Sequence, residues 1–487
     1  MPDLLNELLK ELDTSNKATC ENTIASEINS VTKDSNSLEE KAEIMAFSFY
    51  ENHDNQDLNR GTYFGPKTVW VSDDGDFSEN PSLSSVDHNI LHYWSERSKK
   101  TNNNLMKARY SGLVWDFSKK VTGKQADFQL AIDYVNSLIA ICDDNLCENI
   151  HAVQKITRAY KVACSLNNKK LIIATIKAMI SLENRIGEDN KPGLWGFTFD
   201  LLILGKGKEK NITSSEIKTI IGDMECRLER LSTGHPPYDC ESAGIPLANY
   251  YRKKNKPVDV SRIIDKICSS FELASTNGDP MKASSFLQHA YNICLIFHQK
   301  EKAENLSKKI LEIGPGLVNS MNVFSRGIDV PEEKLEAYLN SMVKGGLEKS
   351  LSRISAQFIP KKDTVKKQVL ELSNKYPLSY LFEKKLHDHN GRPVATIGSI
   401  EDEDDLNGHI IDQLSQNMTI DSFFLRNSFI KLYNTYNPSS SGLSDYILSS
   451  PVFDDTKRGI IGRGIDAFIA NDYITSIHLL VPQVEAA

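Results

Sequence analysis

The stretch that decides the fold runs from Ile150 to Ile186 and reads IHAVQKITRAYKVACSLNNKKLIIATIKAMISLENRI. Two segments, Ile150–Leu166 and Lys170–Ile186, carry apolar residues at the three- and four-residue intervals of one helix face, and a short polar turn separates them. Small residues, Ala159 and Ala163, lie on either side of Tyr160, as at the crossing of two helices. The pattern predicts two antiparallel helices that pack against each other.

The same pattern continues in both directions along the chain. Amphipathic segments lie at 127–140, 214–232, 242–253, 259–275, 280–298 and 301–313. Ala283 and Ala290, with Tyr291, repeat the small-residue pattern. Paired helices with small residues at their crossings predict a mainly α fold with a tetratricopeptide-like, right-handed α-solenoid. The repeat consensus is too eroded to give a repeat count, and a bundle of irregular helices remains the alternative.

Two stretches depart from the helical pattern. Between Gly61 and Pro81, five apolar or aromatic residues lie among Gly, Pro and Asp, which predicts an extended or short-strand insert: Tyr63, Phe64, Val69, Trp70 and Val71. Asn390-Gly391 is a strong hairpin signal, and it predicts a β-hairpin whose returning strand is Pro393–Ile397. Near the N-terminus, Arg97 and Arg109 lie among aromatic core candidates, where buried stems and ion pairs are expected.

These patterns divide the chain into five expected regions. The divisions are 1–36 (an N-terminal helix and a flexible link), 37–123 (a helical unit with the extended insert), 124–350 (the α-solenoid), 351–415 (a helix and the β-hairpin), and 416–487 (C-terminal helices that begin a bundle). The first helix, Met1–Leu12, has leucines along one side but only one Lys and no Arg, which favours a docking helix over a membrane-surface helix.

Composition excludes several classes of protein. The chain has 487 residues, a net charge of −8 and no apolar run long enough to span a bilayer. The N-terminus has no basic region followed by an apolar core, so no secretory signal is expected. The eight cysteines form no Cys-x-x-Cys and no zinc spacing, which predicts reduced thiols in a cytoplasmic protein. The net negative charge argues against a general nucleic-acid coat.

Three motifs match known chemistry only formally. Gly462-Arg463-Gly464-Ile465-Asp466-Ala467 fits a dinucleotide fingerprint, but polar residues precede it where a buried strand is required. Arg230 and His235 have a ribonuclease-like spacing, but glycine and prolines place His235 at a helix exit, so a catalytic role is rejected. His387 and His389 lack a third ligand. No catalytic residue, cofactor or metal is therefore expected.

The final stretch carries another apolar stripe. Tyr473, Ile477, Leu480, Val481 and Val484 fall on one helix face, and neither a glycine nor a basic last turn follows them. We expect that the chain lacks the remainder of a C-terminal helical domain. The stripe would then be exposed, which predicts a homodimer or aggregation through the C-terminus.

Three stretches together carry a family resemblance: Tyr93–Arg97 with Lys107–Tyr110, Tyr376–Leu378 through Arg392–Ala395, and Asp472–Glu485. The chain resembles large bacterial proteins whose C-terminal domain of unknown function ends in an Arg-Asn-x-x-x-His-Gly signature. That domain is similar to the HEPN superfamily (higher eukaryotes and prokaryotes nucleotide-binding), helical bundles that include RNases of toxin and antiviral systems. The signature is absent here, since Arg426-Asn427 is the only Arg-Asn pair and no His follows it at that spacing.

The resemblance implies a role and a small set of positions. His478, Pro482, Gln483 and Glu485 match the first bundle helix, where His478 and Glu485 would share a face. The leading hypothesis is the scaffold and sensor portion of an RNA-cleaving or nucleotide-binding defence protein, inert by itself, with RNA bound through the complete C-terminal domain. The alternative is a non-enzymatic α-solenoid that binds a protein partner. Neither hypothesis involves a membrane.

Overall fold

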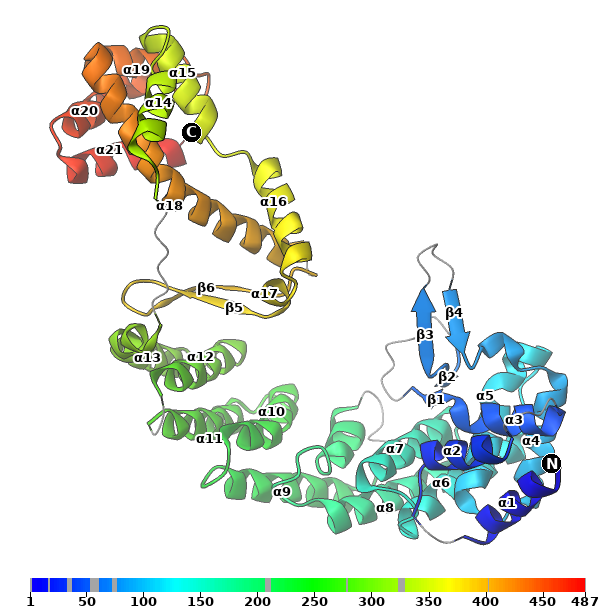
Figure 1. The fold of residues 1–487 in the computed structure, drawn as a ribbon. Coiled ribbons are helices and arrows are strands. Elements are labelled where there is room, and N and C mark those ends of the chain that lie inside the picture. The colour runs from blue at the N-terminus through cyan, green and yellow to red at the C-terminus, as the bar shows by residue number, and fades with distance from the viewer. Residues whose placement is uncertain are drawn as a thin grey trace. The chain divides into compact units, whose positions relative to one another are not determined.

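The computed structural model describes residues 2–15, 18–32, 37–52, 61–71, 77–205, 212–276, 279–322, 329–401 and 403–486. Helices account for 74% of the chain, and the strands form only small antiparallel hairpins. The fold is therefore mainly α, as the sequence predicts. The chain divides into two compact units, Met1–Ile310 and Leu311–Ala487, whose elements follow one another as labelled in Figure 1.

The first unit begins with short helices and two small hairpins. Its elements are α1 (Pro2–Thr14), α2 (Glu21–Val31), α3 (Leu38–Ser48), β1 (Tyr50–Glu51), β2 (Phe64–Gly65), β3 (Thr68–Val71), β4 (Phe77–Asn80), α4 (His88–Lys100) and α5 (Asn104–Thr122). β1 pairs with β2 and β3 with β4, both antiparallel, which confirms the extended insert. Leu5 and Leu9 of α1 are buried, so the N-terminal helix docks on its own chain.

The predicted flexible link over 13–36 is wrong for Glu21–Val31. These residues form α2, and its side chains Ile24 and Ile28 are fully buried. Two isoleucines four residues apart lie on one helix face, and their burial offsets the poor helix propensity of the Ser, Thr and Asn residues around them. Residues 33–36 lie outside the described part of the chain.

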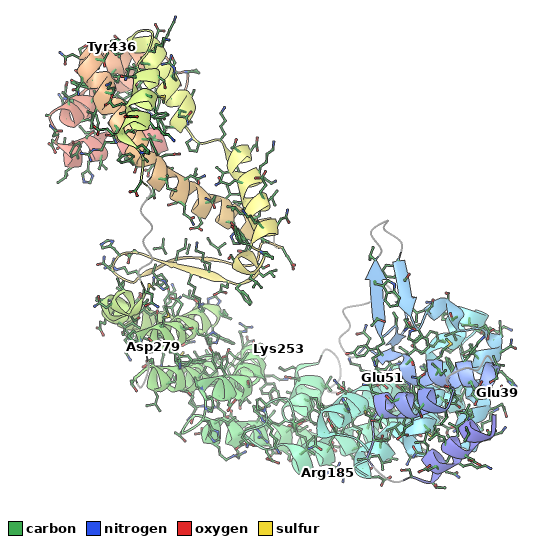
Figure 2. All side chains as sticks on the ribbon, viewed as in Figure 1. Glu39, Glu51, Arg185, Lys253, Asp279 and Tyr436 are labelled. Carbon is green, nitrogen blue, oxygen red and sulfur yellow. The ribbon has the colours of Figure 1, made fainter. Side chains whose placement is uncertain are left out.

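A buried network of charges holds these helices together. Glu43 accepts hydrogen bonds from the Tyr93 and Tyr110 hydroxyls, at 2.8 and 2.7 Å, and from Arg97 Nε at 3.1 Å. Burial raises the pKa of the Glu43 carboxyl, against the opposing effect of Arg97. Glu51, labelled in Figure 2, pairs with Arg109 Nη1 at 2.9 Å. The expected ion pairs of Arg97 and Arg109 are thus confirmed.

The second part of this unit is a succession of antiparallel helices. Its elements are α6 (Phe128–Asp143), α7 (Asn149–Ser165), α8 (Lys169–Ile186), the short π-helix η3 (Phe199–Leu204), α9 (Ser214–Leu231), α10 (Pro237–Lys253), α11 (Pro257–Thr276), α12 (Pro280–Ile296) and α13 (Lys300–Ser320). α7 and α8 are the two helices that Ile150–Ile186 predicts. In Figure 1, α9 to α13 lie side by side as stacked helices.

The stack has a repeat of 43 residues. α9, α11 and α13 begin at residues 214, 257 and 300, while α10 and α12 begin at 237 and 280. The turns after α10 and α12 place Asn255 and His298 in the left-handed region, with φ of 54° and 57°. This period lies within the ~40–47 residues of HEAT and armadillo repeats and exceeds the 34 of tetratricopeptide repeats. The tetratricopeptide likeness stays a prediction.

Ion pairs between successive first helices follow the same period. Glu229 of α9 pairs with Lys266 of α11 at 2.8 Å. Their counterparts 43 residues later, Glu272 of α11 and Lys309 of α13, pair at 2.7 Å. Because each pair is partly exposed, it contributes little to stability, about 0–1 kcal/mol. The two ion pairs support the 43-residue repeat, since equivalent positions of two repeats make equivalent contacts.

The second unit contains the C-terminal helices and one hairpin. Its elements, after the end of α13, are α14 (Glu332–Met342), α15 (Leu347–Phe358), α16 (Lys362–Lys375), α17 (Leu378–Leu381), β5 (Lys384–His387), β6 (Pro393–Ile397), α18 (Glu403–Tyr436), α19 (Ser440–Leu448), α20 (Arg458–Ile469) and α21 (Tyr473–Glu485). β5 and β6 form the antiparallel hairpin that Asn390-Gly391 predicts. The four residues from Leu378 are a short helix.

α18 packs against two separate small cores. One gathers Met342, Leu351 and Ile354 around Leu432, and the other gathers Val365 and Val369 around Ile410. At the first core, the hydroxyl of Tyr436, labelled in Figure 2, donates to the Val343 carbonyl.

The predicted region boundary at 415/416 falls inside α18 and is wrong. The sequence predicts separate helical segments at Ile410–Leu414 and Ile420–Tyr433. The structure has one continuous helix there. No Gly or Pro lies between the two segments, so polar residues on the outer side leave the backbone hydrogen bonds intact. Likewise, the division between the two units falls inside α13, within the predicted solenoid region 124–350.

Candidate functional site

The four positions implied by the family resemblance all lie on α21. Asp472 caps this helix by accepting a hydrogen bond from the Thr475 backbone N–H at 3.1 Å. His478, Pro482 and Glu485 are exposed, and Gln483 is half-buried. Within the described part of the chain, neither His478 nor Glu485 makes a side-chain hydrogen bond or an ion pair. The described residues therefore include no catalytic partner bonded to His478 or Glu485.

α21 has two apolar faces with different surroundings. Leu479 and Leu480 pack against α20, so closely that a Cβ added to Gly464 would lie 2.6 Å from Leu480 Cδ2. The other face is exposed, and we call it the α21 face: Tyr473, Ile474, Ile477, Val481 and Val484. Its side chains are between 48% and 74% exposed. The expected exposure of the stripe is confirmed, except that Leu480 belongs to the packed side.

The rejected motifs are found in the settings that the sequence indicates. Gly462–Ala467 lies inside α20, with the 3-10 turn 455–457 before it where a dinucleotide site needs a strand. His387 ends β5, and His389 Nε2 lies 3.0 Å from Asn390 Nδ2 in the hairpin turn. No cluster of three or more His, Cys, Asp or Glu side chains suited to a metal occurs among the described residues.

Arg230 takes part in a site that sequence reasoning does not predict. A cleft of about 220 Å³ lies between α8 and α9, and Thr198 and Phe199 at the start of η3 also line it. Its polar lining includes Glu183 and Asn184 from α8 and Asp223, Arg227 and Arg230 from α9. The residues of α9 fall at i, i+4 and i+7, so they share one helix face. That spacing is the only sequence signal that could have indicated the cleft.

The two arginines of this cleft pair with Asp189, which lies in the connection after α8. Asp189 accepts two hydrogen bonds from Arg230, from Nε at 2.6 Å and from Nη2 at 3.0 Å, and a further one from Arg227. The Arg230 hydrogen bond is the main cause that lowers the pKa of Asp189, and Arg227 adds to it. Arg227 also stacks over Trp195, 4.7 Å from its ring centroid, and burial lowers the Arg227 pKa.

Glu183 fixes the other side of the cleft. Its carboxylate accepts hydrogen bonds from the Gly196 N–H at 2.7 Å and from the Thr198 N–H and hydroxyl at 3.0 and 2.6 Å. Glu183 thereby holds the connection between α8 and η3 to α8, and Asp189, which lies in this connection, holds it to α9. Since both carboxylates already hold several donors, the arrangement anchors this connection and leaves neither of them poised as a base.

His235 lies in the connection between α9 and α10 and is half-buried. It is near enough to lower the pKa of Asp189 slightly, but Arg230 is committed to that same carboxylate. Arg230 is therefore held by Asp189, and the rejection of Arg230 and His235 as a catalytic pair stays a prediction.

Comparisons with known proteins add no relative. No protein-family model matches the chain, and neither a curated protein nor a solved structure is similar to it at a significant level. None of the helices in the described ranges combines the length and the apolar character needed to cross a membrane.

Proposed function

We propose that this chain is a non-enzymatic scaffold that associates with other protein chains. The observation that carries the proposal is the α21 face, which presents five large side chains to solvent on one side of one helix. Full burial of a Val or Ile side chain stabilises by about 1.5–3 kcal/mol relative to exposure. A contiguous face of this kind is typical of an interaction site.

A second copy of the chain is the proposed occupant of the α21 face. Ile474, Ile477, Val481 and Val484 follow the i, i+3, i+7, i+10 spacing with which two helices interdigitate. In an antiparallel pair centred near Leu479, Ile477 of each copy meets Val481 of the other, so the face is its own complement. No charged side chain belongs to the face, so like charges do not oppose the pairing.

The mass of the protein in solution tests the proposal. Ile477→Glu places a carboxylate in the middle of the face and should convert a dimer to a monomer in light scattering or sedimentation. Ile420→Glu on α18 is the matched control, since Ile420 is 55% exposed and outside the face. It should leave the dimer intact. A wild-type protein that stays monomeric at high concentration contradicts the proposal.

We call α9 to α13 the repeat region, and it is the proposed surface for a different protein partner. Tyr238 of α10 is 47% exposed and packs edge-on against Phe271 and Phe286, at centroid distances of 5.2 and 6.1 Å. Beside it, His289 Nε2 lies 2.8 Å from Glu241 Oε2. Exposed aromatic residues are enriched at binding surfaces. A partner bound by the wild type should be lost with Tyr238→Ala and retained with Ser242→Ala on the same helix.

The defence-protein hypothesis stays a prediction that rests on the resemblance alone. The scaffold proposal expects the purified chain to leave RNA intact. Cleavage of RNA that is lost with His478→Ala would overturn the scaffold proposal and support a HEPN-like ribonuclease.

A further inference from the structure

Two cysteines of the repeat region lie in direct contact. Cys268 of α11 and Cys294 of α12 have their Sγ atoms 3.3 Å apart, and neither residue has any exposed surface. They lie in adjacent antiparallel helices, 26 positions apart in the sequence. Both are free thiols. Sequence reasoning treats them as separate buried thiols, because no short spacing links them.

The repeat explains why these two positions meet. Their counterparts 43 residues earlier are Glu225 of α9 and Tyr251 of α10, whose side chains are close enough for Glu225, in addition to burial, to raise the pKa of Tyr251. The same crossing of first and second helix therefore joins side chains in both repeats. In one repeat the crossing holds a carboxylate and a phenol, and in the next it holds two thiols. The contact between the cysteines follows from the geometry of the repeat.

We propose that Cys268 and Cys294 are an oxidation site, at which a hydroperoxide converts the two thiols into a disulfide that joins α11 to α12. A disulfide places its sulfur atoms about 2.05 Å apart, so the two side chains must approach by little more than about 1 Å. The bond would fix one helix pair of the repeat region. This inference rests on the helix crossing and is independent of the scaffold proposal.

The step balances with the hydroperoxide as the two-electron oxidant. The Cys294 thiolate attacks a peroxide oxygen, the O–O bond breaks, and the leaving oxygen takes up a proton, which leaves Cys294 as a sulfenic acid. Cys268 sulfur then attacks the Cys294 sulfur, the S–O bond breaks, and water leaves with the proton of the Cys268 thiol. Two thiols are oxidised and one peroxide bond is reduced.

The positions of the two thiols in their helices set the order of attack. The thiolate is the nucleophile in such reactions. Cys294 lies in the last turn of α12, which ends at Ile296, whereas Cys268 lies in the interior of α11. Helix ends open more readily than helix centres, so Cys294 is the thiol that a peroxide reaches first. Opening of this turn gives a small peroxide its access.

Peptide mapping of the whole chain tests the proposal. Exposed thiols such as Cys226 are first alkylated on the folded protein, hydrogen peroxide is added, and the remaining thiols are labelled with a second reagent after denaturation. Trypsin releases Cys268 in peptide 267–282 and Cys294 in peptide 283–300, with no other cysteine in either. We expect the two peptides to be joined, lighter by two hydrogens, and separated again by dithiothreitol.

Variants and an internal control make the test specific. Cys268→Ser should abolish the joined peptide and leave a Cys294 sulfenic acid that dimedone traps. Cys240, which is buried without a second thiol beside it in the described structure, should still take the second label. The proposal is overturned if both peptides carry the second label at a peroxide concentration that oxidises Cys226 in an unblocked sample. This readout needs no variant, so a folding defect in Cys268→Ser would not affect it.

Discussion

Single residues set how closely the helices of the repeat region approach. A Cβ on Gly244 of α10 would lie 2.5 Å from Ile267 Cδ1 of α11, and Ile267 is fully buried. Only a glycine fits at this crossing without displacing its neighbour. Gly222 of α9 is different, because nothing lies within 4 Å of a Cβ placed there. Two helical glycines of one region thus occupy opposite environments.

The two glycines should therefore respond to alanine with opposite signs. Gly244→Ala should destabilise the first unit by about 1–3 kcal/mol from overpacking, less the helix propensity gained. Gly222→Ala should stabilise it by about 0.5–1 kcal/mol, because only the propensity changes. Urea unfolding midpoints measure both. A destabilised Gly222→Ala together with an unaffected Gly244→Ala would contradict the close crossing.

Glu21 should make the first unit sensitive to acid. Burial alone would raise the pKa of its carboxyl, but Lys155, 2.5 Å away, and Arg109 outweigh burial and lower the pKa to about 2. Because the folded-state pKa is below the unfolded one, the stabilisation is present above about pH 5 and is lost as the pH falls toward 2. It amounts to something on the order of 3 kcal/mol.

Glu21→Gln should remove this part of the pH dependence. Unfolding free energies from urea titrations between pH 2 and pH 6 measure it as a shallower slope. Lys155→Gln should also change the slope, because Glu21 then keeps the burial that raises its pKa without the lysine that lowers it. An unchanged slope in both variants would show that the pair contributes nothing to acid stability.

Among the elements, the C-terminal hairpin depends on a close backbone contact. A Cβ on Gly314 of α13 would lie 2.2 Å from the Asn390 carbonyl oxygen, and Gly391 adopts a φ of 74°. The turn requires a left-handed backbone at residue 391, and the close contact leaves no space for a Cβ at residue 314. Glycine meets both requirements without strain. The hairpin signal in Asn390-Gly391 therefore predicts the turn, while its packing needs Gly314, which is 76 positions earlier in the sequence.

Gly314→Ala should loosen the β5–β6 hairpin from α13. The obstacle is a backbone carbonyl, which cannot rotate away as a side chain can, so the hairpin itself must move. Hydrogen exchange of the amides in Lys384–Ile397 should become faster by tenfold or so, equal to about 1.4 kcal/mol of lost protection. Gly459→Ala on α20 is the control, because its added Cβ meets nothing within 4 Å.

On the scale of the whole molecule, the two units carry different spectroscopic reporters. The four tryptophans, Trp70, Trp94, Trp115 and Trp195, all belong to the unit Met1–Ile310. Tryptophan fluorescence therefore follows that unit alone, whereas circular dichroism follows the helices of both. Units with separate cores are expected to unfold in separate transitions.

Fluorescence and circular dichroism should give unfolding curves that do not coincide. Glu43→Ala should lower the free energy of unfolding of the first unit by about 3–5 kcal/mol, because it leaves Arg97 and two hydroxyls without their buried acceptor. The fluorescence midpoint should therefore move to a lower urea concentration. The part of the circular dichroism curve that comes from the second unit should stay in place. Coincident curves in the wild type would show that the two units unfold together.

The sequence by itself determined the features that depend on local order. Apolar periodicity gave the helices of Ile150–Ile186, the Asn390-Gly391 pair gave the hairpin, and the Asp472–Val484 stripe gave a helix with an exposed face. Each depends on residues only a few positions apart, where backbone geometry and helix or strand period are sufficient.

The tertiary structure alone decided the contacts between distant residues. The 43-residue period, the crossing of Cys268 with Cys294 and the Asp189 pairing of Arg227 and Arg230 join positions separated by tens of residues. Local patterns do not predict contacts between residues so far apart in the sequence. An apolar helix face indicates that the face will be buried, but it does not indicate which element will cover it. The sequence patterns therefore did not predict α2 or the continuity of α18. Packing against other elements stabilises these helices where their own apolar periodicity is weak.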